Sequence, residues 1–167
     1  MIEDCYMTGI IDKINSLYPI SDDTIRTLKE SMTLCRFPKK YQLIRAGMYC
    51  KSAYFIGKGM TRSFWLVNEE FVETLEDVVV YRISLDKLRR LFETNIELAN
   101  WGRIIHQDEY RRLHRSHKER LTLSAKERYE EFRQQFPQVN QRAQLGYIAS
   151  YLGITLSTLS RLRGARK

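Results

Sequence analysis

One stretch near the C-terminus, from Leu145 to Arg163, restricts the fold more than any other part of the chain. Its first half has apolar residues at a helical spacing, which predicts a short helix with one buried face: Leu145, Ile148, Ala149 and Leu152. Gly153 follows where the chain must turn, because glycine adopts a positive φ at little cost. Thr155 can then cap a second helix, whose apolar residues are Leu156, Leu159 and Leu162. The stretch therefore predicts a helix-turn-helix.

The other positions of the second helix carry hydroxyl and guanidinium groups and no carboxylate. Such groups reach base edges and phosphates in the major groove of DNA. We therefore expect six residues to contact DNA: Thr155, Ser157, Thr158, Ser160, Arg161 and Arg163. Two packed terminal helices without a DNA-binding role are the simpler alternative. The small residue Ala149, the turn residue Gly153 and the aliphatic Leu159 occur together at the spacing of a helix-turn-helix, which argues against that alternative.

The distribution of charge agrees with a nucleic-acid partner. Residues 97–167 contain 14 Lys and Arg against 7 Asp and Glu, whereas residues 1–96 contain 14 against 13. Nearly all of the net charge of +8 therefore lies in the C-terminal part, and no Asp or Glu follows Glu131. A basic half beside a nearly neutral half suggests a nucleic-acid-binding module attached to a second module.

The texture of the N-terminal half predicts short strands between flanking helices. From Cys35 to Ile83, aromatic and β-branched segments alternate with glycine turns, which is typical of an antiparallel roll or barrel. Helices are expected over about 6–14, 22–32 and 84–92. A long helix over 96–119 follows, and Ser124 to Glu127 forms a capping box that opens another helix, which ends before Pro137. The fold class is therefore α+β.

The long helix also predicts how the chain assembles. Five of its residues recur every three or four positions: Leu98, Trp101, Ile105, Asp108 and Arg112. The rest of the helix is too strongly charged to be buried alone. A narrow coiled-coil seam with a second copy would cover this stripe, so we expect a homodimer.

Other chemistries find little support. The three cysteines, Cys5, Cys35 and Cys50, are scattered and odd in number, which suits a reducing compartment and is too few for an iron–sulfur cluster. His114 and His117 could share a metal, but solvent-exposed helix residues are the simpler interpretation, and we assign no metal site. No nucleophile with a neighbouring base is legible, so we expect no enzyme. A haem or redox sensor in the roll stays open.

Targeting signals are also absent from the sequence. No run of about 18 apolar residues predicts a membrane span. The first residues lack the layout of a signal peptide. We therefore expect a cytoplasmic protein.

In this order, the predicted elements resemble the catabolite-activator/fumarate-nitrate-regulator (Crp/Fnr) superfamily of bacterial transcription factors. Gly47, Ala53–Ile56 and Gly59 resemble the early strands of its cyclic-nucleotide-binding-type β-roll. Glu73–Ile83 resembles the last strands, and Ile148–Arg161 resembles the DNA-reading segment.

The resemblance implies three functional segments: a sensor β-roll over 1–95, a dimerisation helix over 96–120 and a helix-turn-helix domain over 121–167. It implies a homodimer that reads an inverted repeat in double-stranded DNA through residues 155–163. RNA polymerase would be a further partner, and an unknown small-molecule effector would bind in the roll.

Two departures from the family matter. The phosphate-binding cassette, a Gly-Glu pair followed by Arg and a small hydroxyl residue, is missing after Val67, so we expect no cyclic nucleotide as a cofactor. The abrupt join inside the roll favours omission of a segment from the sequence over a true deletion. In the DNA-reading helix, Leu156-Ser157 replaces the Arg-Glu pair of the activator type, while Arg161 is kept, so the target sequence should differ.

Two other functions stay open at the level of the sequence. One is an effector-sensing module whose DNA binding is vestigial and which acts through protein partners. The other is a small enzyme built on a β-roll, for which the sequence offers no positive sign.

Overall fold

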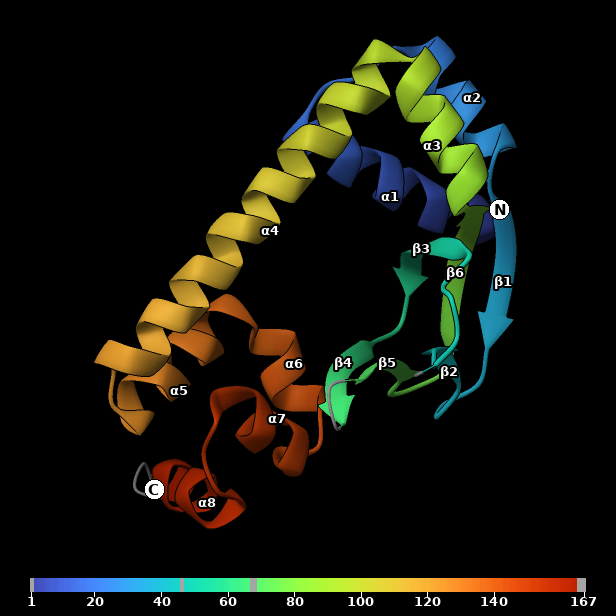
Figure 1. Ribbon diagram of the computed structural model, residues 1–167. Coiled ribbons are helices and arrows are strands. Elements are labelled where there is room, and N and C mark those ends of the chain that lie inside the picture. Colours follow the sequence, from blue (N-terminus) through green and yellow to red (C-terminus); the bar gives the residue numbers. More distant parts are fainter. Residues whose placement is uncertain (1, 46, 67–68, 165–167) are drawn as a thin grey trace. The chain divides into compact units, whose positions relative to one another are not determined.

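The computed structural model describes residues 2–45, 47–66 and 69–164. In these residues eight helices and six strands form an α+β fold (Figure 1), which confirms the expected class. The chain divides into two compact units, Met1–Gln107 and Asp108–Lys167. The boundary falls inside the long helix α4 (Ile96–Thr122), so the compact units differ from the three functional segments expected from the sequence.

Six antiparallel strands lie in the first unit. They are β1 (Thr33–Phe37), β2 (Gln42–Ile44), β3 (Ser52–Lys58), β4 (Thr61–Leu66), β5 (Glu69–Thr74) and β6 (Val78–Ser84). One sheet has the order β1-β6-β3 and the other β2-β5-β4. β4 and β5 pair from Thr61↔Thr74 to Leu66↔Glu69, so the two sides of the expected cassette position are paired directly. Residues 67 and 68, at the join itself, lie outside the described residues.

Three further helices belong to the first unit: α1 (Ile2–Leu17), α2 (Asp22–Glu30) and α3 (Leu85–Thr94). Ser21 caps α2 and Ser84 caps α3, in both cases by accepting a hydrogen bond from a backbone N–H of the first turn. Both caps agree with the sequence, because Ser followed by acidic residues is a strong signal for a helix start.

One hydrophobic core joins these helices to the β1-β6-β3 sheet. Its buried residues come from α1, the α1–α2 connection, α2, β6 and α4: Ile10, Ile11, Ile14, Ile20, Leu28, Tyr81, Leu98 and Trp101. Leu98 is completely buried, and the ring of Trp101 stacks on Phe55 with centroids 6.0 Å apart. The first turns of α4 are therefore part of the core of the first unit.

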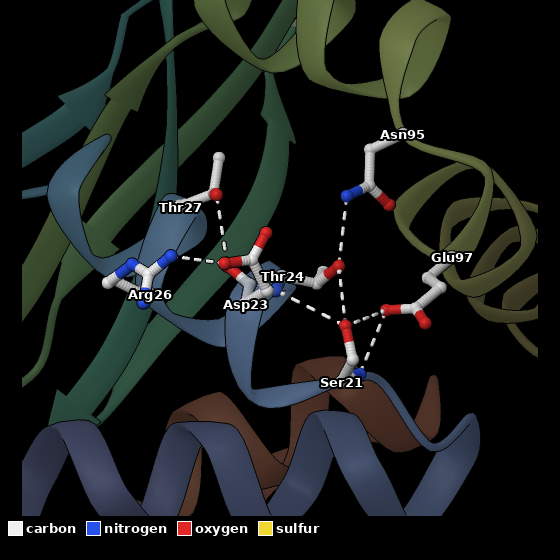
Figure 2. Close-up of polar contacts among 7 residues, drawn as sticks. All are labelled: Ser21, Asp23, Thr24, Arg26, Thr27, Asn95 and Glu97. Atoms are coloured by element: carbon white, nitrogen blue, oxygen red, sulfur yellow. Dashed lines mark hydrogen bonds and ion pairs between the residues drawn. The ribbon is translucent and has the colours of Figure 1, made fainter.

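A polar network fastens the start of α4 to the start of α2 (Figure 2). The backbone N–H and the hydroxyl of Ser21 donate to Glu97 Oε2 at 2.8 and 2.9 Å. The Asn95 amide donates to the hydroxyl of the buried Thr24 at 2.9 Å, and its oxygen accepts from the Leu98 N–H at 3.0 Å. Hydrogen bonding from Thr24 and Ser21 lowers the pKa of Glu97, because these bonds favour the charged carboxylate.

The second unit is helical. It holds the C-terminal part of α4 followed by α5 (Ala125–Gln135), α6 (Pro137–Arg142), α7 (Leu145–Leu152) and α8 (Leu156–Gly164). The capping box from Ser124 to Glu127 is present with both of its hydrogen bonds. Helix α6 is not among the elements expected from the sequence, where Pro137 only ends the preceding helix. Proline is also favoured at the first position of a new helix, which is where Pro137 lies in α6.

The second unit has its own core, formed by α5, α7 and α8. Its buried residues are Tyr129, Phe132, Ile148, Ala149, Leu152 and Leu159. Among the described residues, no helix is both long and apolar enough to span a bilayer.

Candidate nucleic-acid interface

The turn between α7 and α8 has the geometry that its glycine predicts. Gly153 has φ 65° and ψ 38°, in the left-handed region. The N–H of Ile154 donates to the Ala149 carbonyl at 3.0 Å, and the N–H of Gly153 to the Ser150 carbonyl at 3.1 Å. This pair of bonds closes α7 with a Schellman-type cap. No atom lies within 4 Å of the place where a Cβ would stand, so the backbone conformation, rather than space, favours glycine here.

The core fixes which side of each helix is turned inward. Ile148, Ala149 and Leu152 of α7 are buried as expected, and Leu159 of α8 is fully buried. Leu156 differs from the expectation, since it is 51% exposed. It occupies the first position of α8, and Ile154 of the turn packs against this core instead.

The six residues expected to contact DNA all lie at or within α8. Thr155 caps the helix, its hydroxyl accepting from the Thr158 N–H at 3.1 Å. The same hydroxyl lies 2.9 Å from those of Ser157 and Thr158. Five of the six residues are exposed and Thr158 is half-buried. Local contacts thus already engage the hydroxyl of Thr155.

The helical rotation of about 100° per residue places these residues on different sides of α8. Ser157 and Arg161, one turn apart, lie opposite the buried Leu159, and Ser160 flanks them. Arg163 lies nearer the buried side, at the last turn of α8. Within the residues that the structure describes, the guanidinium groups of Arg161 and Arg163 have no hydrogen-bond or ion-pair partner and are exposed. Over its described residues, the outward face of α8 therefore offers one free guanidinium group, that of Arg161, beside short hydroxyls.

The expected dimer seam is partly wrong. Leu98 and Trp101 are 0% and 5% exposed inside the core of their own chain, and Ile105 packs on the same core. The spacing of three and four identified a buried face of α4 correctly, but that face is covered by α1, α2 and the sheet. Leu98 and Trp101 are therefore unavailable to a second copy.

Asp108 and Arg112, the other two residues of that seam, form local ion pairs. Asp108 pairs with Arg111 at 2.8 Å, and Arg112 pairs with Glu109 at 2.6 Å. Both residues also line a cavity of about 240 Å³ within the second unit, together with Gln135, Phe136 and Tyr151.

A different side of α4 carries exposed apolar residues. Tyr110, Leu113 and Leu121 are 72%, 63% and 74% exposed. They share one face with His106 and His117, because residues separated by three, four, seven or eleven positions lie close together on a helix. Tyr110 follows Trp101 by about two and a half turns, so the two residues fall on opposite sides of a helical projection of the α4 sequence. A helical projection of the sequence, rather than the first apolar spacing met, would have identified this stripe.

Arg62 and Arg82 are two of the arginines in the sheets of the first unit. Arg62 is half-buried, pairs with Glu73 at 3.5 Å and lies 4.1 Å above the ring of Phe64, so it supports the β4–β5 hairpin. Arg82 is exposed and lies opposite Tyr54 in the β3–β6 register. Burial, with the nearby Cys50 thiol as a second cause, raises the pKa of Tyr54.

Known proteins resemble this chain in structure, while comparison of the sequence alone finds no relative. No protein-family model matches the sequence, and neither does any curated protein. Among solved structures, FixK2 from Bradyrhizobium japonicum matches at TM-score 0.69 with 17% identity, over 80% of this chain and 83% of that one. A CooA variant from Carboxydothermus hydrogenoformans matches at TM-score 0.65 with 14% identity, over 93% and 83%.

The chain has a Crp/Fnr-type fold. The structure of the c-di-GMP-responsive global regulator CLP from Xanthomonas campestris also matches, at TM-score 0.63 with 14% identity, over 85% of this chain and 89% of that one. Helices α7 and α8 cover the segment that the resemblance gives as DNA-reading, Ile148–Arg161. At identities of 14–17%, the likeness concerns the fold.

Proposed function

We propose that this protein is a sequence-specific, double-stranded-DNA-binding transcription regulator that reads DNA through α8. One observation carries the proposal. The face of α8 opposite Leu159 holds Ser157, Ser160 and Arg161 and no carboxylate, and Leu159 with the Gly153 turn anchors the other side of the helix in a packed core. A helix of this kind fits a major groove, where cations meet phosphates and donors meet base edges.

The positions of these residues on α8 suggest different roles for four of the six. Ser157 and Arg161 lie at the centre of the outward face and are proposed to contact bases. Arg161 can donate two hydrogen bonds to the O6 and N7 atoms of a guanine. Arg163, near the end of α8, is proposed to contact phosphate, and Thr155 to act mainly as the helix cap.

We further propose a homodimer in which the exposed stripe of α4 forms the seam. Tyr110, Leu113 and Leu121 supply the apolar surface that Leu98 and Trp101 cannot supply. Pairing two copies along this stripe would cover large apolar side chains that are otherwise in water. Two-fold symmetry would then place two copies of α8 on half-sites about 34 Å apart, one turn of DNA.

The other parts of the proposal follow from the Crp/Fnr-type fold. The first unit would sense a small molecule of unknown identity, and RNA polymerase would be a partner of the DNA-bound protein. The missing phosphate cassette argues against a cyclic nucleotide as the effector.

Substitution of Arg161 tests the proposal. Arg161→Ala should weaken binding to a duplex selected from a random pool by about 1–3 kcal/mol and relax selectivity at one base pair. Arg115→Ala is the matched control, since it removes the same charge from an exposed site on α4. Equal losses for both variants, on selected and unselected duplexes alike, would show that Arg161 contributes only charge.

A further inference from the structure

Two arginines converge on the C-terminal end of α7, the helix that leads into the turn before α8. Arg128 of α5 donates from Nε to the Leu152 carbonyl at 3.2 Å. Arg120 of α4 donates from one terminal nitrogen to the Tyr151 carbonyl at 3.3 Å. All of these residues belong to the second compact unit.

Arg128 also holds the end of a second helix. Its other arm donates to the Leu123 carbonyl at 2.6 Å. Leu123 directly follows α4, and its own N–H closes that helix by donating to the Glu119 carbonyl at 2.9 Å. A single half-buried guanidinium therefore links the C-terminal ends of α4 and α7.

The physical chemistry of helix ends makes these contacts strong. The last four carbonyls of a helix have no partner inside it and carry the negative end of the helix dipole. A guanidinium satisfies such carbonyls, and its charge strengthens such bonds. Of the three bonds here, the one from Arg128 to the Leu123 carbonyl is the shortest, at 2.6 Å. Its planar fork can serve two acceptors at once, which the single ammonium group of lysine does with far less geometric control.

We propose that Arg120 and Arg128 are positioning residues that set the direction of α8 relative to α4. This inference rests on the proposed function, in which α4 pairs two copies and α8 reads DNA. If α4 sets the two-fold axis, the link from α4 through Arg128 to α7 fixes the separation and tilt of the two reading helices. The arginines thereby determine which half-site spacing the dimer accepts.

Aromatic contacts alone would leave this direction less constrained. Tyr151 packs on Phe132 and Phe136, with ring centroids 5.5 and 6.3 Å apart. Such contacts are broad in geometry, whereas the two guanidinium groups fix individual carbonyl oxygens. Loss of the arginines should therefore loosen the direction of α8 without removing the core beneath it.

The test compares one half-site with two. Wild-type protein is first used to select a half-site, and duplexes are then built with one copy or with two inverted copies whose separation varies by single base pairs. The variants are Arg120→Met, Arg128→Met and Arg128→Lys. Arg115→Met on α4 and Lys126→Met on α5 are matched controls, because each removes one charge at an exposed residue of the same helix.

The expected result separates orientation from folding. We call Arg120 and Arg128 together the arginine clamp. Each clamp variant should bind the single half-site with an affinity within about twofold of its control. On the best-spaced double site it should lose about tenfold in affinity, and its dependence on half-site spacing should be broader. Arg128→Lys should fall between wild type and Arg128→Met. Thermal melting by circular dichroism checks the fold, and if Arg128→Met unfolds, Arg120→Met and Arg128→Lys carry the test.

Two results would overturn the inference. One is an unchanged spacing profile in all folded clamp variants. The other is an equal loss on single and double sites, which would mean that the arginines support the α7–α8 pair itself rather than its direction. Failure of the wild type to select any half-site would be a different result, since it would refute the proposed function from which the inference starts.

Discussion

Two glycines of the α7–α8 region should respond to the same substitution with opposite signs. Gly153 ends α7 at φ 65°, whereas Gly146 lies inside the first turn of α7. No atom lies within 4 Å of either position where a Cβ would be added, so a methyl group fits at both. The difference between the two variants therefore reports backbone conformation and little else.

The magnitudes follow from the backbone. An alanine in the left-handed region costs about 1–2 kcal/mol, and part of this is offset by about 0.4–1 kcal/mol because alanine makes the unfolded chain less flexible. Gly153→Ala should therefore destabilise the α7–α8 region by about 1 kcal/mol. Gly146→Ala should stabilise it by about 0.5–1 kcal/mol. Gly153→Asn should lie closer to wild type than Gly153→Ala, because asparagine tolerates the left-handed region.

Hydrogen exchange of α7 and α8 amides, read by mass spectrometry, measures this difference locally, which matters in a chain with two compact units. Equal protection of these amides in Gly153→Ala and Gly146→Ala would refute the prediction. In that case the positive φ at Gly153 would not be a requirement of the turn.

Three further predictions concern the core, the junction and the assembly. Leu159→Ala should lower the free energy of opening of the second unit by about 2–5 kcal/mol, while Leu156→Ala, at an exposed site, should leave it nearly unchanged. Hydrogen exchange of α5 amides measures the opening free energy of both variants. Similar losses for the two would contradict the burial of Leu159 in this core. Because hydrogen bonds lower the pKa of Glu97, its contribution to stability is present above the pKa of an unfolded glutamate and is lost as pH falls through the lowered value. Melting temperatures of wild type and Glu97→Gln should therefore differ at pH 7 and converge toward pH 3, and a constant difference would refute this. In analytical ultracentrifugation, Leu113→Glu should be a folded monomer where the wild type is a dimer. Gln134→Glu, an equal charge change at an exposed site on α5, should stay dimeric. A dimeric Leu113→Glu protein would exclude the exposed stripe of α4 as the dimer interface.

Local patterns predicted the parts of this fold that depend on local physics. The buried positions Ile148, Ala149 and Leu152 follow from helical periodicity, and the turn at Gly153 from the tolerance of glycine for positive φ. The capping box at Ser124 followed from side-chain chemistry within four residues. In each case the determinants lie inside the segment itself.

Tertiary partners explain the misses. The periodicity of Leu98 and Trp101 reveals a buried face of α4 and cannot say whether a second copy or the chain's own core covers it. The clamp between Arg128 and Leu152 joins residues 24 positions apart, with no signal in either segment. Such contacts arise only once the helices are packed. The candidate face of α8 was therefore predictable from the sequence, while the contacts of Arg120 and Arg128 with the end of α7 were not.

The central claim is that α8 reads a DNA sequence, and selection of bound duplexes from a random pool at two salt concentrations tests it most directly. The account predicts an inverted repeat with half-sites one helical turn apart that survives the higher salt, because base contacts lose less affinity to salt than phosphate contacts do. Recovery of only salt-sensitive duplexes without a common sequence would contradict it. The basic second unit would then be an electrostatic surface, and α8 would not read bases.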